Sequence, residues 1–249
     1  MDKIKNMRPL HIIMPMAGEG SRFVREGWTT PKPLIKVHGF PLFQRALSSI
    51  EQGIFPIKYS FIVRQEHIES YGIDAVIKQI VPQADIFSVR QTTRGAVETC
   101  LLAESSLAAD DAVLVMDCDL EFRCAAFNAR IKQILSQDSQ AQGGLLVSFP
   151  ATDPRYSYAE TDERTGNVVR IAEKEVISGH ALCGAYFFAS SSCFLHAANK
   201  LLTDGTFRKP EFYVSLLYNY LLHENQSVQL FEVEEYYSYG TPEELGRYL

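Results

Sequence analysis

Cysteine is scarce in this chain of 249 residues, and its pattern argues against two common uses of the residue. The five cysteines are scattered, odd in number and never spaced as C-x-x-C. Such a pattern does not fit a disulfide framework or a structural zinc site, and it is typical of proteins from a reducing compartment. We therefore expect a cytoplasmic protein.

Long apolar runs and an excess of positive charge are also missing. No stretch approaches the roughly 20 apolar residues that a membrane-spanning helix needs. The short apolar run near the N-terminus leads into a glycine-rich turn, which does not fit a signal peptide. The net charge of -6 argues against a nucleic-acid-binding protein. We expect no membrane partner and no nucleic-acid partner.

What is present is the composition of an ordinary globular protein, with 46% hydrophobic and 22% charged residues. A chain of this length can bury a substantial core, as one large α/β domain or as two small ones. Proline and glycine are dispersed, so no linker divides the chain. We therefore expect a single domain over residues 1–249.

Apolar runs alternate with segments of helical apolar spacing along the first 150 residues. This alternation predicts a Rossmann-like α/β fold, with a mostly parallel twisted central sheet and helices on both faces. The predicted strands are Leu10–Met16, Lys58–Val63, Asp85–Val89, Ala112–Met116, Gly144–Phe149, Val168–Ala172, Ala181–Phe188 and Val228–Val233. The predicted helices are Leu42–Glu51, Arg94–Ser106, Ala126–Ser136, Ser191–Leu202 and Glu211–His223.

The alternation breaks between residues 153 and 174. There, two short runs rich in β-forming residues flank the polar segment Asp162–Asn167. A polar turn between two such runs is typical of a β-hairpin. We therefore predict a small hairpin appended to the main sheet.

The most informative segment is the apolar run Ile12–Met16, followed by the glycine-rich turn Ala17–Arg22. A strand that ends in such a turn exposes consecutive backbone N–H groups, which can hold phosphate oxygens. Arg22 lies in the turn, and Lys32 follows between two prolines that restrict its direction. Because a backbone nest with two cations suits a polyphosphate, the segment predicts a nucleoside triphosphate site.

Two common nucleotide-binding motifs do not fit this turn. The dinucleotide fingerprint needs a small residue where Phe23 stands, since the helix must approach the strand closely there. The Walker loop needs Gly-Lys-Ser/Thr, and residues 23–25 read Phe-Val-Arg. The nucleotide site must therefore belong to another class.

A second motif, Asp117-Cys118-Asp119, ends the apolar run at residues 112–116. Two carboxylates at a strand end can hold Mg²⁺, with water completing the coordination. The structural alternatives are that the aspartates cap the next helix and that Lys32 is a surface lysine. Because ligands of parallel sheets lie beyond the carboxyl ends of the strands, we expect the aspartates and the glycine turn to share one cleft.

The order of these motifs resembles that of the sugar-phosphate nucleotidyltransferases. The signature of that family runs (M/L)-A-G-x-G-(S/T)-R-(F/L), then P-K-P-L and then G-x-P, and residues 16–41 match it. Further blocks follow in the family's order at residues 91–96, 113–122, 172–187 and 239–245. The resemblance implies a GT-A-like nucleotidyltransferase fold in which residues 150–190 form a lid over the acceptor half of the site.

The resemblance also implies roles for individual residues. The implied catalytic residues are Arg22, Lys32 and Asp119, and the implied ligands of Mg²⁺ are Asp119 and Asp117. The implied nucleotide-binding residues are Ala17, Gly18, Gly20, Ser21, Gln91 and Gly95. The implied acceptor-binding residues are Glu173, Lys174, Gly184 and Tyr186. Among these, Gln91 can pair with a pyrimidine edge, and Gly95 lets a base approach the backbone.

The chain departs from the family at Ser238, where relatives usually carry a second metal-binding carboxylate. A hydroxyl is a weak ligand of Mg²⁺. Asp119 would therefore act with water, with Asp117, or with Glu234 or Glu235. The departure also leaves open a protein that binds a nucleotide without turning it over.

The resemblance implies transfer of a nucleotidyl group from a nucleoside triphosphate to a phosphorylated sugar or another small phosphorylated metabolite, as in nucleotide-sugar and polysaccharide biosynthesis. A CTP-dependent cytidylyltransferase for an acceptor such as phosphocholine is an alternative, since tyrosines near the lid can form a wall for a sugar or a quaternary ammonium group. A GT-A glycosyltransferase and a non-catalytic nucleotide-binding protein are further alternatives. The resemblance is compatible with a homo-oligomer.

Overall fold

The computed structural model describes residues 7–136, 143–204, 206–207 and 209–249. Its strands are β1 (Leu10–Met16), β2 (Lys36–Val37), β3 (Phe40–Pro41), β4 (Ile57–Arg64), β5 (Asp85–Val89), β6 (Ala112–Met116), β7 (Leu120–Arg123), β8 (Gly144–Pro150), β9 (Ser157–Thr161), β10 (Val168–Glu173), β11 (His180–Phe188), β12 (Val228–Glu232) and β13 (Glu235–Ser238). Its α-helices are α2 (Ser21–Arg25), α3 (Leu42–Ser48), α4 (Gln65–Tyr71), α5 (Ile73–Ile80), α6 (Ala96–Leu101), α7 (Ala125–Ser136), α8 (Ser191–Thr203), α9 (Leu217–His223) and α10 (Pro242–Leu245). Short 3₁₀ helices lie at Lys32–Leu34, Glu104–Ser106 and Val214–Leu216. Within these ranges, no helix combines the length and apolar character needed to cross a membrane.

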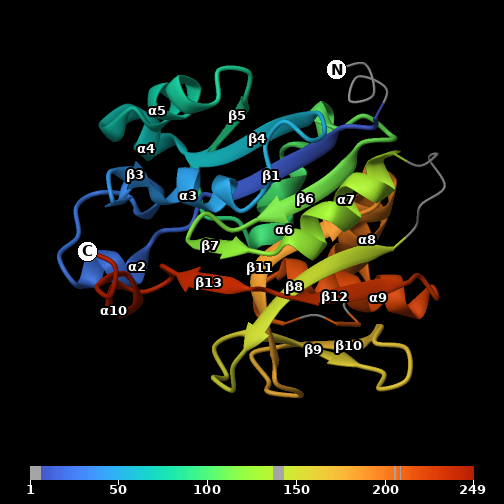
Figure 1. Cartoon of the computed structure of the whole chain (residues 1–249). Coiled ribbons are helices and arrows are strands. Elements are labelled where there is room, and N and C mark those ends of the chain that lie inside the picture. Colours follow the sequence, from blue (N-terminus) through green and yellow to red (C-terminus); the bar gives the residue numbers. More distant parts are fainter. Residues whose placement is uncertain (1–6, 137–142, 205, 208) are drawn as a thin grey trace.

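The central sheet has nine strands in the described part of the chain (Figure 1). Seven follow the order β10-β9-β11-β6-β1-β4-β5, and β8 joins β11 to β12. Strand β1 lies between β4 and β6 and is parallel to both, and β5 continues the parallel part. Strand β11 is antiparallel to β6. The predicted α/β fold is confirmed, with its parallel strands concentrated in the N-terminal half of the chain.

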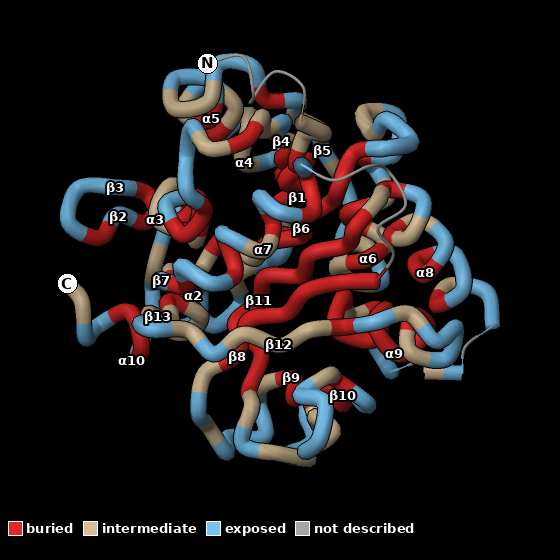
Figure 2. The backbone as a smooth tube through the Cα atoms, turned by 45° about the vertical axis from the view of Figure 1, so that its right-hand side comes forward, coloured by how far each residue is buried: buried red, intermediate tan, exposed pale blue. Residues whose placement is uncertain are grey.

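Helices cover both faces of this sheet, as predicted (Figure 1). Ile12 and Met14 of β1 belong to a core shared with α3, α5 and α7. Ile13 belongs to a second core, shared with α6, α8 and α9. Because successive side chains of a strand point to opposite faces, one continuous apolar run contributes to both cores. Figure 2 shows the resulting burial of the central strands.

The predicted helix Leu42–Glu51 ends early, at Ser48, and two other predicted helices begin later in the structure than the apolar spacing indicated. The first begins at Ala96, and the second begins as a 3₁₀ helix at Val214. Between them, the Phe212 N–H donates to the Arg94 carbonyl and the Phe212 carbonyl accepts from the Val97 N–H, both at 3.0 Å. These long-range bonds occupy backbone groups that a longer helix would need for its own ladder.

The predicted hairpin is present as β9 and β10, joined by a turn at residues 162–167. A small two-stranded sheet of β7 and β13 was not predicted. It sets Ser238 opposite Leu120, and beyond it the Tyr239 N–H donates to the Asp119 carbonyl at 2.8 Å. The C-terminal segment is thereby fixed beside the Asp117–Asp119 motif.

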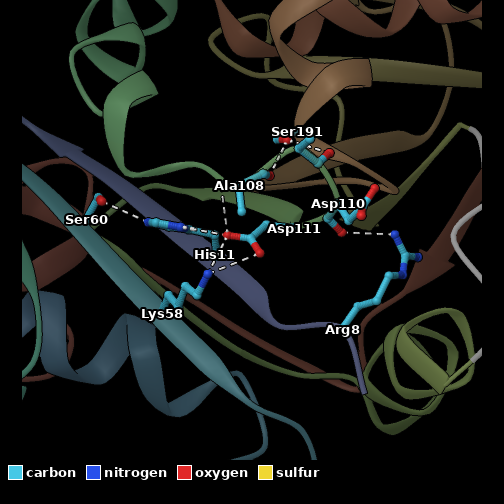
Figure 3. Close-up of polar contacts among 9 residues, drawn as sticks. Arg8, His11, Lys58, Ser60, Ala108, Asp110, Asp111 and Ser191 are labelled. Atoms are coloured by element: carbon cyan, nitrogen blue, oxygen red, sulfur yellow. Dashed lines mark hydrogen bonds and ion pairs between the residues drawn. The ribbon is translucent and has the colours of Figure 1, made fainter. Parts of the chain in front are cut away.

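A buried polar cluster joins the amino ends of β1, β4 and β6, at the opposite end of the sheet from the glycine turn (Figure 3). The His11 Nε2 atom lies 2.8 Å from Ser60 Oγ, and its Nδ1 atom lies 3.6 Å from Asp111 Oδ2. The Lys58 Nζ atom lies 2.9 Å from the same carboxylate oxygen. Although this order resembles a nucleophilic triad, Ser60 is 0% exposed and a substrate cannot reach it. The cluster therefore serves to hold the three strands together.

Acidification is expected to destabilise the protein through His11. Burial lowers the pKa of this side chain, against the opposing effect of Asp111, so the folded state favours the neutral imidazole. The unfolded state binds the proton more readily. The His11 contribution to stability is therefore present above the ordinary value of about 6.5 and is lost as the pH falls toward the lower folded value.

Urea unfolding at pH 7.5 and pH 5.5 measures this effect. The loss of stability between the two pH values is expected to be smaller in His11→Gln than in the wild type. His38→Asn, at an exposed position, is the matched control and should leave the loss unchanged. An equal loss in His11→Gln would show that His11 is not a source of the pH dependence.

Candidate active site

The glycine turn follows the carboxyl end of β1 and connects it to α2. Gly20 has a φ of 62°, which lies in the left-handed region that glycine adopts without strain. Phe23 follows in α2 and is buried, with its ring 5.8 Å from the ring of Trp28. A large residue at this point packs beneath the turn instead of letting the helix approach the strand. The structure thus accounts for the departure from a dinucleotide fingerprint.

Lys32 contacts the second motif directly. Its Nζ atom lies 2.7 Å from Asp119 Oδ2, and the lysine side chain is 26% exposed. Burial alone would lower the pKa of Lys32, but the nearby Asp119 carboxylate raises it above the usual value. Lys32 is therefore a fixed cation at the strand ends, and the alternative of a freely solvated surface lysine does not hold.

Asp117 packs closely against β11 because residue 184 of that strand is a glycine. A Cβ atom on Gly184 would lie 2.6 Å from Asp117 Oδ2, and Gly184 has a φ of 90°. The Gly184 carbonyl also accepts from the Asp117 N–H at 2.9 Å. Burial raises the pKa of Asp117 to about 7, and the charge of Asp119 adds to the rise. A cation near the two carboxylates would favour their ionised forms.

Two adjoining cavities meet at Asp117 and Asp119. One, of about 240 Å³, is lined by Gly18, Gly20 and Lys32. The other, of about 270 Å³, extends toward the hairpin and the C-terminal segment. Sequence-predicted site residues that line this second cavity are Arg22, Glu173, Lys174, Gly184 and Tyr186. One cleft therefore brings together residues from blocks that lie far apart in the sequence.

Glu173 and Lys174 end the hairpin strand β10. Glu173 is buried, and its carboxylate accepts hydrogen bonds from the hydroxyls of Ser157 and Ser215. Lys174 has a φ of 57°, and its Nζ atom lies 2.5 Å from the Tyr213 hydroxyl. Both side chains line the second cavity and are held by neighbours that fix their direction.

The two predicted base-binding residues lie outside these two cavities. Gln91 is exposed and lines neither of them. At Gly95, a Cβ atom would lie 2.4 Å from the Phe212 backbone nitrogen, so close packing of two segments by itself requires glycine there. The role of both residues in binding a base stays a prediction.

Ser238 lines the second cavity together with Asp119. The expectation that Glu234 or Glu235 reaches Asp119 is wrong. Arg123 binds both glutamates, with Nε 3.1 Å from Glu234 Oε2 and a terminal nitrogen 2.8 Å from Glu235 Oε1. The reason is the pairing of β13 with β7, which sets Glu235 opposite Arg123 and away from the cavity.

The wall of the second cavity also contains a group of residues to which the sequence motifs assigned no individual role. An Arg155 guanidinium nitrogen lies 2.8 Å from Glu244 Oε1, and the Tyr156 hydroxyl donates to the same oxygen at 3.0 Å. Burial and the charge of Glu244 raise the pKa of Tyr156 to about 12, so its hydroxyl keeps the proton that it donates. Thr241-x-x-Glu244 has the pattern of a capping box, which would have predicted a local role for this glutamate.

The residues Asp117 and Asp119 fit a magnesium ion. In the described ranges, no three His, Cys, Asp or Glu side chains gather as a metal-binding group. Mg²⁺ is usually held by one or two carboxylates, with substrate phosphates and water supplying the remaining oxygens. An oxygen-only pair at the mouth of a phosphate-binding turn therefore suits Mg²⁺ better than it suits zinc.

The fold is similar to those of solved nucleotidyltransferase structures. A nucleoside-diphosphate-sugar pyrophosphorylase from Vibrio cholerae RC9 is 25% identical, with 96% of this chain and 99% of that chain covered and a TM-score of 0.81. A Bacillus anthracis structure described as a glucose-1-phosphate thymidylyltransferase, in complex with sucrose, is 19% identical over 96% of this chain and 93% of that one, with a TM-score of 0.73.

The inositol-1-phosphate CTP transferase of T. maritima is 13% identical, with 96% of this chain and 91% of that chain covered and a TM-score of 0.72. No protein-family model matches the chain, and a search of curated proteins finds no match. The structural matches confirm the resemblance to the sugar-phosphate nucleotidyltransferases. The predicted class of enzyme, a nucleotidyltransferase, is confirmed with it.

Proposed function

We propose that this protein joins a nucleoside triphosphate to a phosphorylated sugar or related small phosphorylated metabolite and releases pyrophosphate. The observation that carries the proposal is the 2.7 Å contact between Lys32 Nζ and Asp119 Oδ2 in the cleft of the glycine turn. In this proposal, the pair supplies a fixed cation and a metal-binding carboxylate beside the phosphates of the bound triphosphate. The similarity to the Vibrio cholerae pyrophosphorylase supports the same reaction class.

The reaction is an in-line attack by an acceptor phosphate oxygen on the α-phosphorus of the triphosphate. The acceptor phosphate is largely ionised near pH 7, so no general base is required. Catalysis then depends on aligning two polyanions and on stabilising the charge that develops on the α-phosphate and on pyrophosphate. In this proposal, Lys32 contacts the α-phosphate, while Arg22 and the backbone of the glycine turn hold the β- and γ-phosphates.

Asp119 and Asp117 would hold Mg²⁺ in the loaded site. When bound, the ion supplies positive charge that is shared between the two carboxylates and the phosphates. Lys32 then has two tasks. It balances the charge of Asp119 before the nucleotide binds, and it faces the reacting phosphate afterwards.

The acceptor occupies the second cavity in this proposal, beneath a lid formed by residues 150–190. Lys174 faces the acceptor phosphate, and Glu173 accepts hydrogen bonds from the rest of the acceptor. Gly184 and Tyr186 of β11 line the same cavity and would contact the acceptor as well. The described elements share a continuous central sheet, so we propose that the chain works as one catalytic domain.

Magnesium-dependent release of pyrophosphate tests the proposal. Five nucleoside triphosphates are screened against sugar 1-phosphates, inositol phosphate, phosphocholine and small phosphorylated acids, with Asp119→Ala as the inactive control. A signal that requires one triphosphate, one acceptor and Mg²⁺ is expected, and chelation should abolish it. Nucleotide binding without pyrophosphate release would favour a non-catalytic protein, and sugar transfer from a nucleotide sugar would favour a glycosyltransferase.

A further inference from the structure

Glu244 is a buried carboxylate that α10 contributes to the second cavity. Its side chain is 7% exposed, and glutamate is rarely buried this far without a partner. One of its oxygens is held by Arg155 and by Tyr156, and Arg155 is held in turn by Asp153, with Nε 3.2 Å from Oδ2. The carboxylate therefore has a fixed direction and a paired charge before any ligand binds.

The other oxygen of Glu244 borders the space beside Asp119. A Cβ atom on Gly240 would lie 3.3 Å from Glu244 Oε2 and 3.4 Å from Asp119 Oδ2. Glycine at this position keeps the space between the two carboxylates clear. The hydrogen bond from Tyr156 and the ion pair with Arg155 both involve Oε1, so Oε2 is placed to accept a hydrogen bond from a ligand in the cavity.

Two of the four tyrosine rings that line this cavity, those of Tyr156 and Tyr213, already carry cations of the chain itself. The Arg155 guanidinium lies 4.8 Å over the ring of Tyr156, and Lys174 Nζ lies 4.7 Å over the ring of Tyr213. A ring that already holds a cation attracts a second one less, since the two positive charges repel each other. These two rings are therefore poorly suited to a quaternary ammonium group.

Hydroxyl groups suit the same wall better. Glu173 on the lid strand and Glu244 on α10 line one cavity from different elements, and each is anchored by donors of the chain. Carboxylates form strong hydrogen bonds with hydroxyl donors. A ligand without hydroxyls would displace water from both carboxylates without replacing the hydrogen bonds that the water made. This loss would weaken its binding.

From this geometry we propose that Glu244 is a specificity-determining residue that accepts a hydrogen bond from a hydroxyl of a phosphorylated polyol acceptor. Arg155 and Tyr156 are positioning residues, because they hold the glutamate in place. The inference rests on the proposed nucleotidyl transfer and gives a role to a residue that the resemblance left without one, although it lies in the matched block at residues 239–245. It also selects the polyol class over phosphocholine.

The test compares Glu244→Gln with Glu243→Gln in the pyrophosphate-release assay. Glu243 is the adjacent residue of the same helix, its side chain is 84% exposed, and it does not line the cavity. In Glu244→Gln, the KM for the acceptor is expected to rise by about tenfold to a hundredfold, because an amide accepts a hydroxyl hydrogen bond more weakly than a carboxylate does. The KM for the triphosphate should stay within about twofold, and Glu243→Gln should match the wild type.

A second measurement needs no protein variant and so does not depend on whether Glu244→Gln folds. Deoxy analogues of the accepted polyol phosphate are assayed with the wild-type enzyme, and one of them is expected to lose about tenfold or more in kcat/KM. Glu244→Gln should discriminate less against that same analogue. A purely structural role for Glu244 would lower activity with all analogues alike.

The outcomes separate this inference from the reaction on which it rests. Turnover with an unchanged acceptor KM in Glu244→Gln, or a preference for phosphocholine, would overturn the role of Glu244 and leave nucleotidyl transfer standing. Absence of turnover with every pair of substrates would overturn the reaction. In that case calorimetry with inositol phosphate and sugar 1-phosphates decides the inference: weaker binding to Glu244→Gln supports it, and equal binding or none overturns it.

Discussion

Asparagine in place of Asp119 is expected to reduce pyrophosphate release by about a thousandfold or more, which corresponds to about 4 kcal/mol of transition-state stabilisation. The substitution keeps the size of the side chain and removes its charge. The position that would bind Mg²⁺ then loses a ligand, and Lys32 loses the carboxylate oxygen that lies 2.7 Å from its Nζ atom. Groups that act on developing phosphate charge have effects of this size.

The measurement is kcat/KM for pyrophosphate release with the substrate pair that the screen identifies. Glu235→Gln is the matched control, because Glu235 lies on the strand next to the site but binds Arg123 at 2.8 Å. It should retain activity within about twofold. If Asp119→Asn kept more than about a tenth of the wild-type activity, Asp119 would not be a required ligand of the Mg²⁺ ion.

Alanine at Gly95 is expected to destabilise the protein by about 2–4 kcal/mol. A Cβ atom there would lie 2.4 Å from the Phe212 backbone nitrogen and 2.7 Å from its carbonyl oxygen. The clashing atoms belong to the backbone of Phe212, which cannot relieve the clash by changing rotamer as a flexible side chain can. Hydrogen bonds of Phe212 to Arg94 and Val97 hold the two segments at this distance, so relieving the clash would break them.

Urea unfolding of Gly95→Ala measures this loss, with Gly179→Ala as the control. A Cβ atom on Gly179 has no neighbour within 4 Å, and its φ lies outside the left-handed region, so the control should change stability by less than about 1 kcal/mol. Equal stability of the two variants would mean that the two segments do not approach each other as closely as the structure describes.

The strands were predictable because their signal is local. The run Leu10–Met16 is recovered with both of its bounds, and so are Asp85–Val89 and Ala112–Met116. Asp85–Val89 is a partly exposed edge strand, which its mixture of polar and apolar residues indicates. Leu10–Met16 and Ala112–Met116 are buried on both faces of the sheet, so they are apolar along nearly their whole length. The two main motifs follow strands of this kind, so their meeting at one edge of the sheet was predictable as well.

Elements that depend on distant partners were not predictable from local pattern. The strands β7 and β13 are four residues each and pair with one another across more than a hundred residues of chain. The sequence of neither strand indicates which strand it pairs with, because the stabilising contacts form only when the two strands lie side by side. The same holds for the late start of the helix after Phe212, which depends on backbone bonds to the segment beside Gly95.

The sequence by itself determined the reaction class and the principal charged groups of the cleft, since motif order and strand ends are properties of the chain. The tertiary structure alone decided which of two adjacent glutamates belongs to the site. Glu243 and Glu244 carry the same side chain on the same short helix, yet the first is exposed and the second is buried. The difference is made by the hydrogen bond from Tyr156, 88 residues earlier, and by the ion pair with Arg155, which together offset the cost of burying that carboxylate.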